Sequence, residues 1–163
     1  MKVKILKIHP DAVIPFKKHK SDFYLDCIAT SEQQIAPGIW KYGLGIALQI
    51  ERDTAWKSMD ILLDIDGLAR SSVWKTGMVL SNCKGVIDEG YTGEISAVFY
   101  QVIPEGTPYI DPQTGEEKKI ERYHVGDRIL QIGIGQSHPI SFEEVEVLDK
   151  TNRGAKGYGS TGK

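Results

Sequence analysis

The sequence predicts an all-β protein, a single-domain β-sandwich or jelly roll. Most apolar segments alternate with polar residues or glycine at a period of two, which is the spacing of a half-buried strand. Turn signals with Gly or Pro recur at short intervals between these segments. A chain of 163 residues can bury a core without disulfides or metal sites. Many short strands with such punctuation are typical of sandwiches and jelly rolls.

The N-terminal segment 1–8 alternates Lys with aliphatic residues, which suits a strand and not a signal peptide. The only helix candidate lies near 54–59. Period-two segments that we expect to form further strands are 44–50, 61–65, 95–103, 129–134 and 142–147, with turns at 36–38, 66–67, 104–106, 126–127 and 137–139. In the stretch 85–94 an apolar run ends at Asp88 and two glycines bracket Tyr91, which predicts a tight hairpin.

Two segments depart from the period-two pattern. Residues 104–124 form a hairpin insertion with mixed charges, interpreted as a solvated face or as an arm that binds a partner. Residues 151–163 contain four glycines and one aromatic residue, a composition that cannot bury enough surface to order itself. We therefore expect a domain at 1–150 and a flexible tail at 151–163.

The composition argues against several classes of protein. A net charge of -2 and a pI near 6.1, with Lys and Arg spread out, give no reason to expect nucleic-acid or membrane binding. The four histidines and two cysteines show no metal-ligand spacing, so a protein-ligated zinc is not expected. Cys27 and Cys83 are interpreted as free thiols in a reducing compartment, which indicates a cytoplasmic protein.

Three stretches carry groups that could perform chemistry. Asp88 and Tyr91 offer a carboxylate and a ring on one backbone bend, which fits either a general base beside a flat ligand or an ordinary solvated turn. Arg70 is followed by two serines, so that a guanidinium fork and two hydroxyls could bind phosphate. The tail combines Arg153 with hydroxyls and free glycine amides, which is the inventory of an anion cradle or simply a disordered end.

Together these stretches resemble the trimeric dUTPase (deoxyuridine triphosphate nucleotidohydrolase) family over about residues 22–163. The family motifs appear in order as Arg70-Ser71-Ser72, Gly85 to Glu94, Gly126-Asp127-Arg128-Ile129-Leu130-Gln131, and the Gly-Tyr-Gly-Ser-Thr-Gly tail. The first family motif, Ala-Gly-Tyr-Asp-Leu-x-Ala, is matched least closely, by residues 24–29. Asp26 is then the motif carboxylate, with Asp22 as its rival. Ala69 replaces the usual proline, and 70–77 looks about one residue short.

The resemblance implies a homotrimer with shared active sites that hydrolyses dUTP to dUMP and pyrophosphate, which limits uracil in DNA and supplies dUMP for dTMP synthesis. By the same resemblance, Asp88 is the general base for a water that attacks the α-phosphorus. Tyr91 packs against the deoxyribose and excludes a ribose hydroxyl. Residues expected to read the uracil are Asn82 and the backbone of Gly85, Val86 and Ile87.

Phosphate binding is assigned, again by resemblance, to groups from the core and from the tail. The core residues are Arg70, Ser71, Ser72 and Gln131, and the tail residues are Arg153, Gly157, Gly159, Ser160 and Thr161. Tyr158, in place of the family's common Phe, is expected to stack over the uracil as the tail closes like a lid. Mg²⁺ bridges the phosphates, with Asp26 contacting it through water.

Two alternatives remain from the sequence. The first is a dCTP deaminase, which shares the fold, but its catalytic Glu aligns with Val98, and valine cannot transfer a proton. The second is a non-catalytic regulatory trimer that binds nucleotide or protein, with the hairpin at 104–124 as the binding arm.

Overall fold

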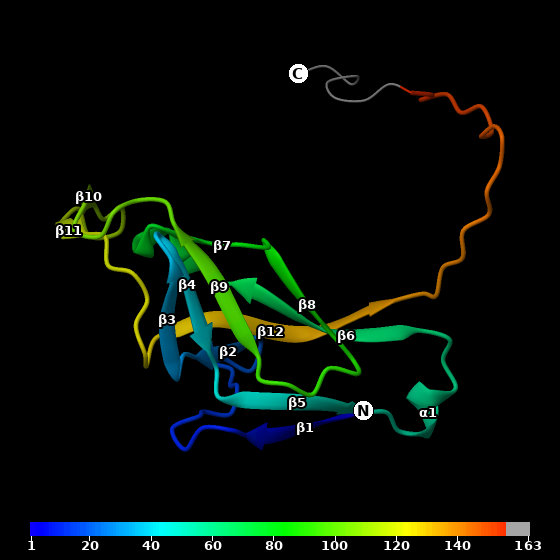
Figure 1. The fold of residues 1–163 in the computed structure, drawn as a ribbon, viewed down its shortest axis with the longest axis horizontal. Coiled ribbons are helices and arrows are strands. Elements are labelled where there is room, and N and C mark those ends of the chain that lie inside the picture. The colour runs from blue at the N-terminus through cyan, green and yellow to red at the C-terminus, as the bar shows by residue number, and fades with distance from the viewer. Residues whose placement is uncertain (156–163) are drawn as a thin grey trace.

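In the computed structural model, which describes residues 1–155, the chain consists almost entirely of short strands (Figure 1). The elements are β1 (Lys2–Lys7), β2 (Leu25–Ile28), β3 (Ser31–Ala36), β4 (Ile39–Gly43), β5 (Ile46–Glu51), α1 (Thr54–Lys57), β6 (Leu62–Ala69), the 3-10 helix η1 (Ser71–Thr76), β7 (Met78–Leu80), β8 (Lys84–Asp88), β9 (Ser96–Gln101), β10 (Pro108–Ile110), β11 (Glu117–Lys119) and β12 (Arg128–Ser137).

The strands form two four-stranded sheets, ordered β2-β12-β6-β8 and β3-β4-β9-β7. Two-stranded pairs, β1-β5 and β10-β11, complete the described fold, and the strand pairings are antiparallel. This architecture confirms the predicted all-β sandwich or jelly roll. Within the segment 104–124, β10 and β11 pair as a hairpin, with Pro108 opposite Lys119.

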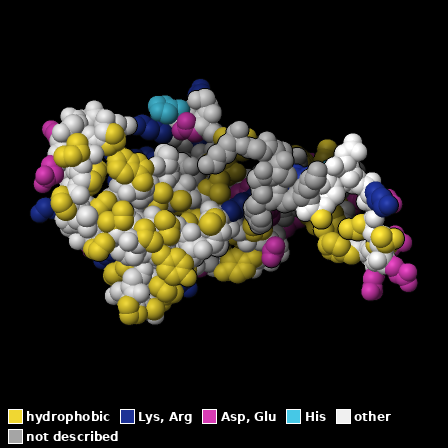
Figure 2. Space-filling model, turned by 90° about the horizontal axis from the view of Figure 1, so that it is seen from above, with side chains coloured by type: hydrophobic (Ala, Val, Ile, Leu, Met, Phe, Trp, Pro, Cys, Tyr) yellow, Lys and Arg dark blue, Asp and Glu magenta, His cyan; other side chains and the backbone are white. Residues whose placement is uncertain are grey.

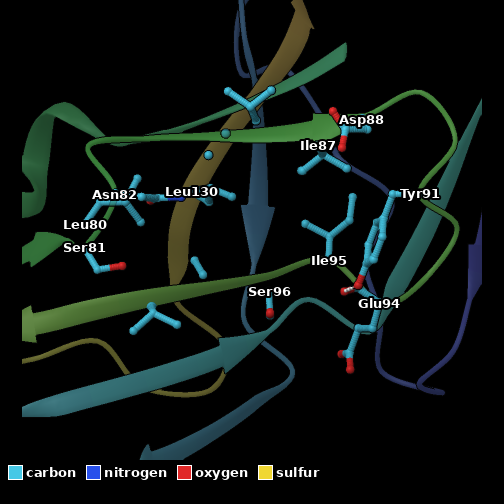
Figure 3. A pocket seen from close by; sticks show the side chains of 15 residues that line it. Leu80, Ser81, Asn82, Ile87, Asp88, Tyr91, Glu94, Ile95, Ser96 and Leu130 are labelled. Atoms are coloured by element: carbon cyan, nitrogen blue, oxygen red, sulfur yellow. Dashed lines mark hydrogen bonds between the residues drawn. The ribbon is translucent and has the colours of Figure 1, made fainter.

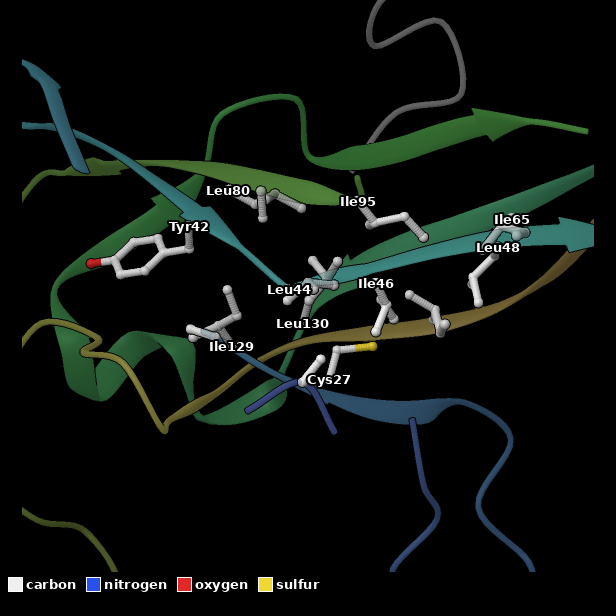
Figure 4. Close-up of a cluster of buried hydrophobic side chains, with 14 of the residues drawn as sticks. Cys27, Tyr42, Leu44, Ile46, Leu48, Ile65, Leu80, Ile95, Ile129 and Leu130 are labelled. Carbon is white, nitrogen blue, oxygen red and sulfur yellow. The ribbon is translucent and has the colours of Figure 1, made fainter. Parts of the chain in front are cut away.

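The core lies between the two large sheets and draws on the inward face of each (Figure 4). Its centre is aromatic: Tyr42, Phe99 and Tyr123 contact one another edge to face, with ring centroids 5.4–6.4 Å apart. Aliphatic side chains from alternate positions of β5, β6 and β12 fill the rest. The period-two pattern therefore marks the buried face correctly in these strands.

Three expectations from the sequence are wrong. Residues 85–94 do not form a hairpin, because β8 pairs with β6 in one sheet whereas β9 pairs with β4 and β7 in the other. The Asp66-Gly67 pair is not a turn but lies inside β6. Residues 142–147 are not a strand, and Phe142 and Val147 are 92% and 83% exposed. Beyond β12 the chain leaves the sandwich as an extended arm (Figure 1).

The two helices are short. The helix α1 falls where it was expected, and the Asp53 side chain accepts a hydrogen bond from the Trp56 amide at its first turn. The helix η1 was not predicted; it ends at Gly77, whose φ of 63° requires a residue without a Cβ. Among the described residues, no helix has the length and apolar character needed to cross a bilayer.

Candidate active site

A cavity of about 280 Å³ opens between the two large sheets beside β8 (Figure 3). Because β8 is an edge strand of its sheet, the backbone N–H and C=O groups on its outer side are free to pair with the polar edge of a flat ligand. Predicted site residues in its lining are Asn82, Gly85, Val86, Ile87, Asp88 and Tyr91. The structure therefore brings together the predicted general base, the sugar residue and the core residues expected to read the uracil, whereas Tyr158 lies outside the described residues.

Asp88 and Tyr91 lie at one end of this cavity, and Asn82 lies at the other (Figure 3). The Tyr91 amide donates to the Asp88 carbonyl at 2.9 Å, and the Tyr91 hydroxyl donates to the Glu94 carbonyl at 3.0 Å. The ring lies so close over Gly93 that a Cβ there would be 2.6 Å from the Tyr91 oxygen. Gly93 is thus required for the loop that presents the ring beside the carboxylate.

Two acidic side chains fasten this loop to the rest of the fold. Glu94 accepts a hydrogen bond from the Gly45 amide at 2.9 Å. Glu89 accepts two from Arg52, at 2.7 and 2.6 Å, while Arg52 also donates to the Ile61 carbonyl at 3.0 Å. The Arg52–Glu89 pair is therefore a bidentate clamp on the residue that follows Asp88.

We expect Glu89→Gln to lower the melting temperature by a few degrees and to lower turnover, because the clamp loses its charge. The hydrogen bond from Arg52 lowers the pKa of Glu89 below its ordinary value of 4.5. A lowered carboxyl pKa stabilises the folded state at neutral pH, and this stabilisation is lost as the pH falls through the folded-state value. Thermal melts should therefore show a difference between wild type and variant that is constant from pH 7 to about pH 5 and shrinks as the pH falls below 4.5.

The matched control is Glu51→Gln, since Glu51 forms a single 2.9 Å ion pair with Lys4 and both side chains are about half exposed. Exposed pairs contribute little to stability. Equal melting shifts in the two variants would contradict a special role for the Arg52–Glu89 clamp.

A second cluster gathers predicted phosphate and metal residues around Asp26, which is 7% exposed. Its Oδ1 accepts from Arg70 Nε at 2.9 Å and from Gln131 Nε2 at 3.4 Å, and its Oδ2 accepts from Arg128 Nη1 at 3.1 Å. Burial alone would raise the pKa of Asp26, but Arg70, Gln131 and Arg128 together hold it below its ordinary value. Asp26 is thus an ionised anchor for two guanidinium groups.

This cluster favours Asp26 over its rival Asp22 and adds a residue, Arg128. Asp22, the rival of Asp26, instead accepts from the His19 amide at 2.8 Å. Arg128 belongs to one of the family motifs but was not predicted as a site residue. Its position directly after Gly126-Asp127 in that motif could have identified it. Ser71 and Ser72 begin η1 directly after Arg70, and Arg70 Nη1 donates to the Ser72 hydroxyl at 3.2 Å.

The hydrogen bonds that Asp26 accepts limit its capacity to coordinate a metal ion. Both of its oxygens are already occupied by arginine or glutamine donors, so direct coordination would have to displace them. Within residues 1–155 no three His, Cys, Asp or Glu side chains are grouped to hold a metal. The described residues of a single chain therefore offer no ready-made set of protein ligands for a divalent ion, whereas an ion bound by substrate and water would need none.

The remaining predicted residues belong to the tail. Arg153 is described and exposed on the arm beyond β12. Gly157, Tyr158, Gly159, Ser160 and Thr161 lie outside the described residues.

Comparison with known proteins shows the family to which this chain belongs. No family model matches the chain. The deoxyuridine 5′-triphosphate nucleotidohydrolase of Corynebacterium glutamicum is 34% identical over 162 residues, covering 99% of this chain and 95% of the relative. The enzyme of the same name from Helicobacter pylori is 31% identical over 165 residues, covering 99% and 97%. The chain belongs to the dUTPase family.

Solved structures agree with the fold. A Staphylococcus bacteriophage 80alpha dUTPase with dUpNHpp superposes with a TM-score of 0.68 at 20% identity, covering 99% of this chain and 98% of the other. The phage phi11 dUTPase, in a variant described as revealing the coordination of a structural Mg(II) ion, superposes at 0.63 with 19% identity, covering 92% and 100%.

The cavity also bears on the deaminase alternative. Val98 lines it, partly buried, at the position where the related deaminases would need a glutamate. The acidic side chains in the described lining are Asp88 and Glu94, and Glu94 is engaged by the Gly45 amide. Asp88 is therefore the candidate acid–base group of this cavity.

Proposed function

We propose that the chain hydrolyses dUTP to dUMP and pyrophosphate, and so limits uracil in DNA and supplies dUMP for dTMP synthesis. The observation that carries the proposal is the pairing of Asp88 and Tyr91 at one end of a cavity walled by the free edge of β8. The Asp88 carboxylate accepts a proton from a water molecule as the water oxygen attacks the α-phosphorus, and pyrophosphate departs.

Selection for deoxyuridine is assigned to the cavity walls. The β8 backbone at Gly85, Val86 and Ile87, together with the Asn82 amide, offers donors and acceptors to the edge of uracil. Tyr91 covers the sugar, so a 2′-hydroxyl meets the ring. A site that rejects substrates by both clash and lost hydrogen bonds discriminates strongly.

Phosphate binding is assigned to Arg70, Ser71, Ser72 and Gln131, together with tail residues Arg153, Gly157, Gly159, Ser160 and Thr161, while Tyr158 stacks on the base. Support for the first group comes from the Asp26 cluster, which fixes the orientation of Arg70. Mg²⁺ is the proposed metal, arriving with the triphosphate, with Asp26 facing it through water. When bound, the ion neutralises phosphate charge. None of the roles above depends on direct metal ligation by the chain.

A homotrimer with shared sites is proposed for this chain. In support, the described lining of the cavity does not include the predicted phosphate residues Arg70, Ser71, Ser72 and Gln131. The cavity for base and sugar and the phosphate residues that complete one site can therefore come from different chains. The single chain also exposes many large apolar side chains, which gather over part of its surface (Figure 2). Phe23 is 76% exposed and Leu148 is 82% exposed. The cytoplasm is the proposed compartment, because Cys27 and Cys83 are both unpaired.

Separate incubations with dUTP, dCTP, dTTP and UTP, assayed for pyrophosphate and ammonia, test the proposal. We expect pyrophosphate release from dUTP that requires Mg²⁺, with rates at least about 100-fold lower for the other nucleotides. Ammonia from dCTP would establish the deaminase instead. Absence of pyrophosphate from dUTP at high protein concentration would favour a binding protein without catalysis.

A further inference from the structure

The 3-10 helix η1 carries the proposed phosphate residues at its start and is held by the hairpin insertion at its end. Gly77, which terminates η1, has its carbonyl hydrogen-bonded by the amides of Val102 and Ile103 at 2.8 and 3.0 Å. A Cβ on Gly77 would lie 2.8 Å from the Ile120 side chain, which is 3% exposed. The base of the hairpin is therefore packed directly against the end of η1.

Asp111, near the hairpin tip, extends this contact electrostatically. The side chain is 1% exposed, which is unusual for an aspartate in a segment whose composition suggests a solvated face. Its Oδ2 accepts from Lys118 Nζ at 2.8 Å and from Lys75 Nζ, on η1, at 3.3 Å. Tyr109 of the hairpin also contacts Trp74 of η1 edge to face, at 5.5 Å between centroids. The hairpin thus contacts η1 through the ion pair of Asp111 with Lys75 and through the ring contact of Tyr109 with Trp74.

Tyr123, at the end of the insertion, approaches the other end of η1. Its ring is fixed in the aromatic core, and its hydroxyl is buried without a well-formed hydrogen bond to any described residue. The groups that act on the pKa of that hydroxyl include Arg70 and Ser72, at the start of η1, as well as Asp127 and Tyr42. Burial raises the pKa of Tyr123 to about 12, against the opposing effects of Arg70 and Ser72, so the group remains a neutral phenol that can donate or accept.

An unpaired buried hydroxyl costs free energy in the folded protein. That cost is recovered if Ser72 or Arg70 shifts slightly when phosphate binds and forms a hydrogen bond with the Tyr123 hydroxyl. Because the two contacts lie at opposite ends of a six-residue helix, together they fix its position along its whole length. A solvated or partner-binding arm requires neither a buried Asp111 nor a phenol facing the phosphate residues.

We propose that the hairpin insertion, residues 104–124, is a brace for the phosphate-binding turn, with Asp111 and Tyr123 as positioning residues at its two ends. This role rests on the proposed function of Arg70, Ser71 and Ser72 as phosphate ligands. From its composition this segment had two interpretations, a solvated face or an arm that binds a partner, and the brace is distinct from both.

Kinetics of Tyr123→Phe and Asp111→Asn test the brace. We expect each variant to raise KM for dUTP and the inhibition constant of pyrophosphate by about three- to tenfold, while kcat changes less than about twofold. Tyr123→Phe should do so with an equal or higher melting temperature, because it removes an unpaired buried hydroxyl. A purely structural tyrosine would instead leave KM unchanged. Glu116→Gln, an exposed carboxylate on the same hairpin, is the matched control.

Amide hydrogen exchange separates the brace from the proposed function, since it needs no turnover. The amides of Val73 and Gly77 donate within η1 and should exchange faster in Asp111→Asn than in wild type or Glu116→Gln. Faster exchange without any dUTP turnover in wild type would retain the brace and reject the function. Turnover with unchanged exchange and unchanged KM in both variants would reject the brace and retain the function.

Discussion

Asp88→Asn should lower kcat for dUTP by about 10² to 10⁴-fold while leaving dUTP binding nearly intact. The amide keeps the size of the carboxylate and the end of β8 in place, but it cannot accept a proton from the attacking water. The cavity wall that reads the base, at Gly85 to Ile87, is unchanged by the substitution. Pyrophosphate release measures kcat, and calorimetric titration with dUTP measures affinity on the inactive variant.

Asp60→Asn is the matched control, because Asp60 is an exposed aspartate between α1 and β6 and lies outside the described lining of the cavity. It should retain wild-type kinetics. Turnover by Asp88→Asn at more than a tenth of the wild-type rate would assign the general base to another group. A large rise in Kd would indicate that Asp88 binds substrate in place of, or besides, activating water.

The sequence predicted the strands well because burial of one sheet face leaves a local signal. Segments 1–8, 44–50 and 129–134 correspond to β1, β5 and β12. Side chains of β5 and β12 enter the core, whereas β1 contributes only the partly buried Ile5. Local motifs likewise placed Asp88 and Tyr91 on one bend. The pattern identifies an element without identifying its partner, and this limit explains the failures.

The stretch 85–94 shows that limit. Its glycines correctly mark a reversal, but whether β8 and β9 pair with each other depends on β6 and β4, which lie far away in the chain. Asp66-Gly67 has the composition of a turn, yet Gly67 lies inside β6, where a Cβ would pack tightly against the Leu130 side chain at 3.3 Å. In 142–147 the alternation is that of a strand, but a strand also requires a partner.

Contacts between distant residues were inaccessible to sequence reasoning for the same reason. Arg52 and Glu89 are 37 positions apart, and Asp111 and Lys75 are 36 apart. Nothing in either local segment distinguishes these residues from ordinary surface charges. Asp26, Arg70 and Gln131 were assigned to one site only because the family motifs contain all three. The structure shows that Arg70 and Gln131 donate hydrogen bonds to Asp26.

Removal of residues 151–163 should reduce kcat/KM for dUTP by about 100-fold or more without unfolding the protein. The last strand ends at Ser137 and the core draws nothing from the tail in the described structure, so the melting temperature should be unchanged. Lost with the tail are the Arg153 guanidinium, the hydroxyls of Ser160 and Thr161, and the proposed lid. Charge-assisted hydrogen bonds contribute about 1.5–3 kcal/mol each, so two of them suffice for the loss.

Mixing the truncated chain with Asp88→Asn chains then tests how the site is assembled. Each chain alone is nearly inactive, for a different reason. If a tail closes over the Asp88 of another subunit, mixed trimers formed by refolding the two chains together contain sites with both an intact Asp88 and an intact tail, and pyrophosphate release recovers to a substantial fraction of wild type. If each tail serves its own chain, no mixed trimer contains a complete site, and the mixture stays as inactive as its components. Recovery therefore requires a site shared between subunits, and its absence would contradict the proposed sharing even if the truncated chain behaves as expected.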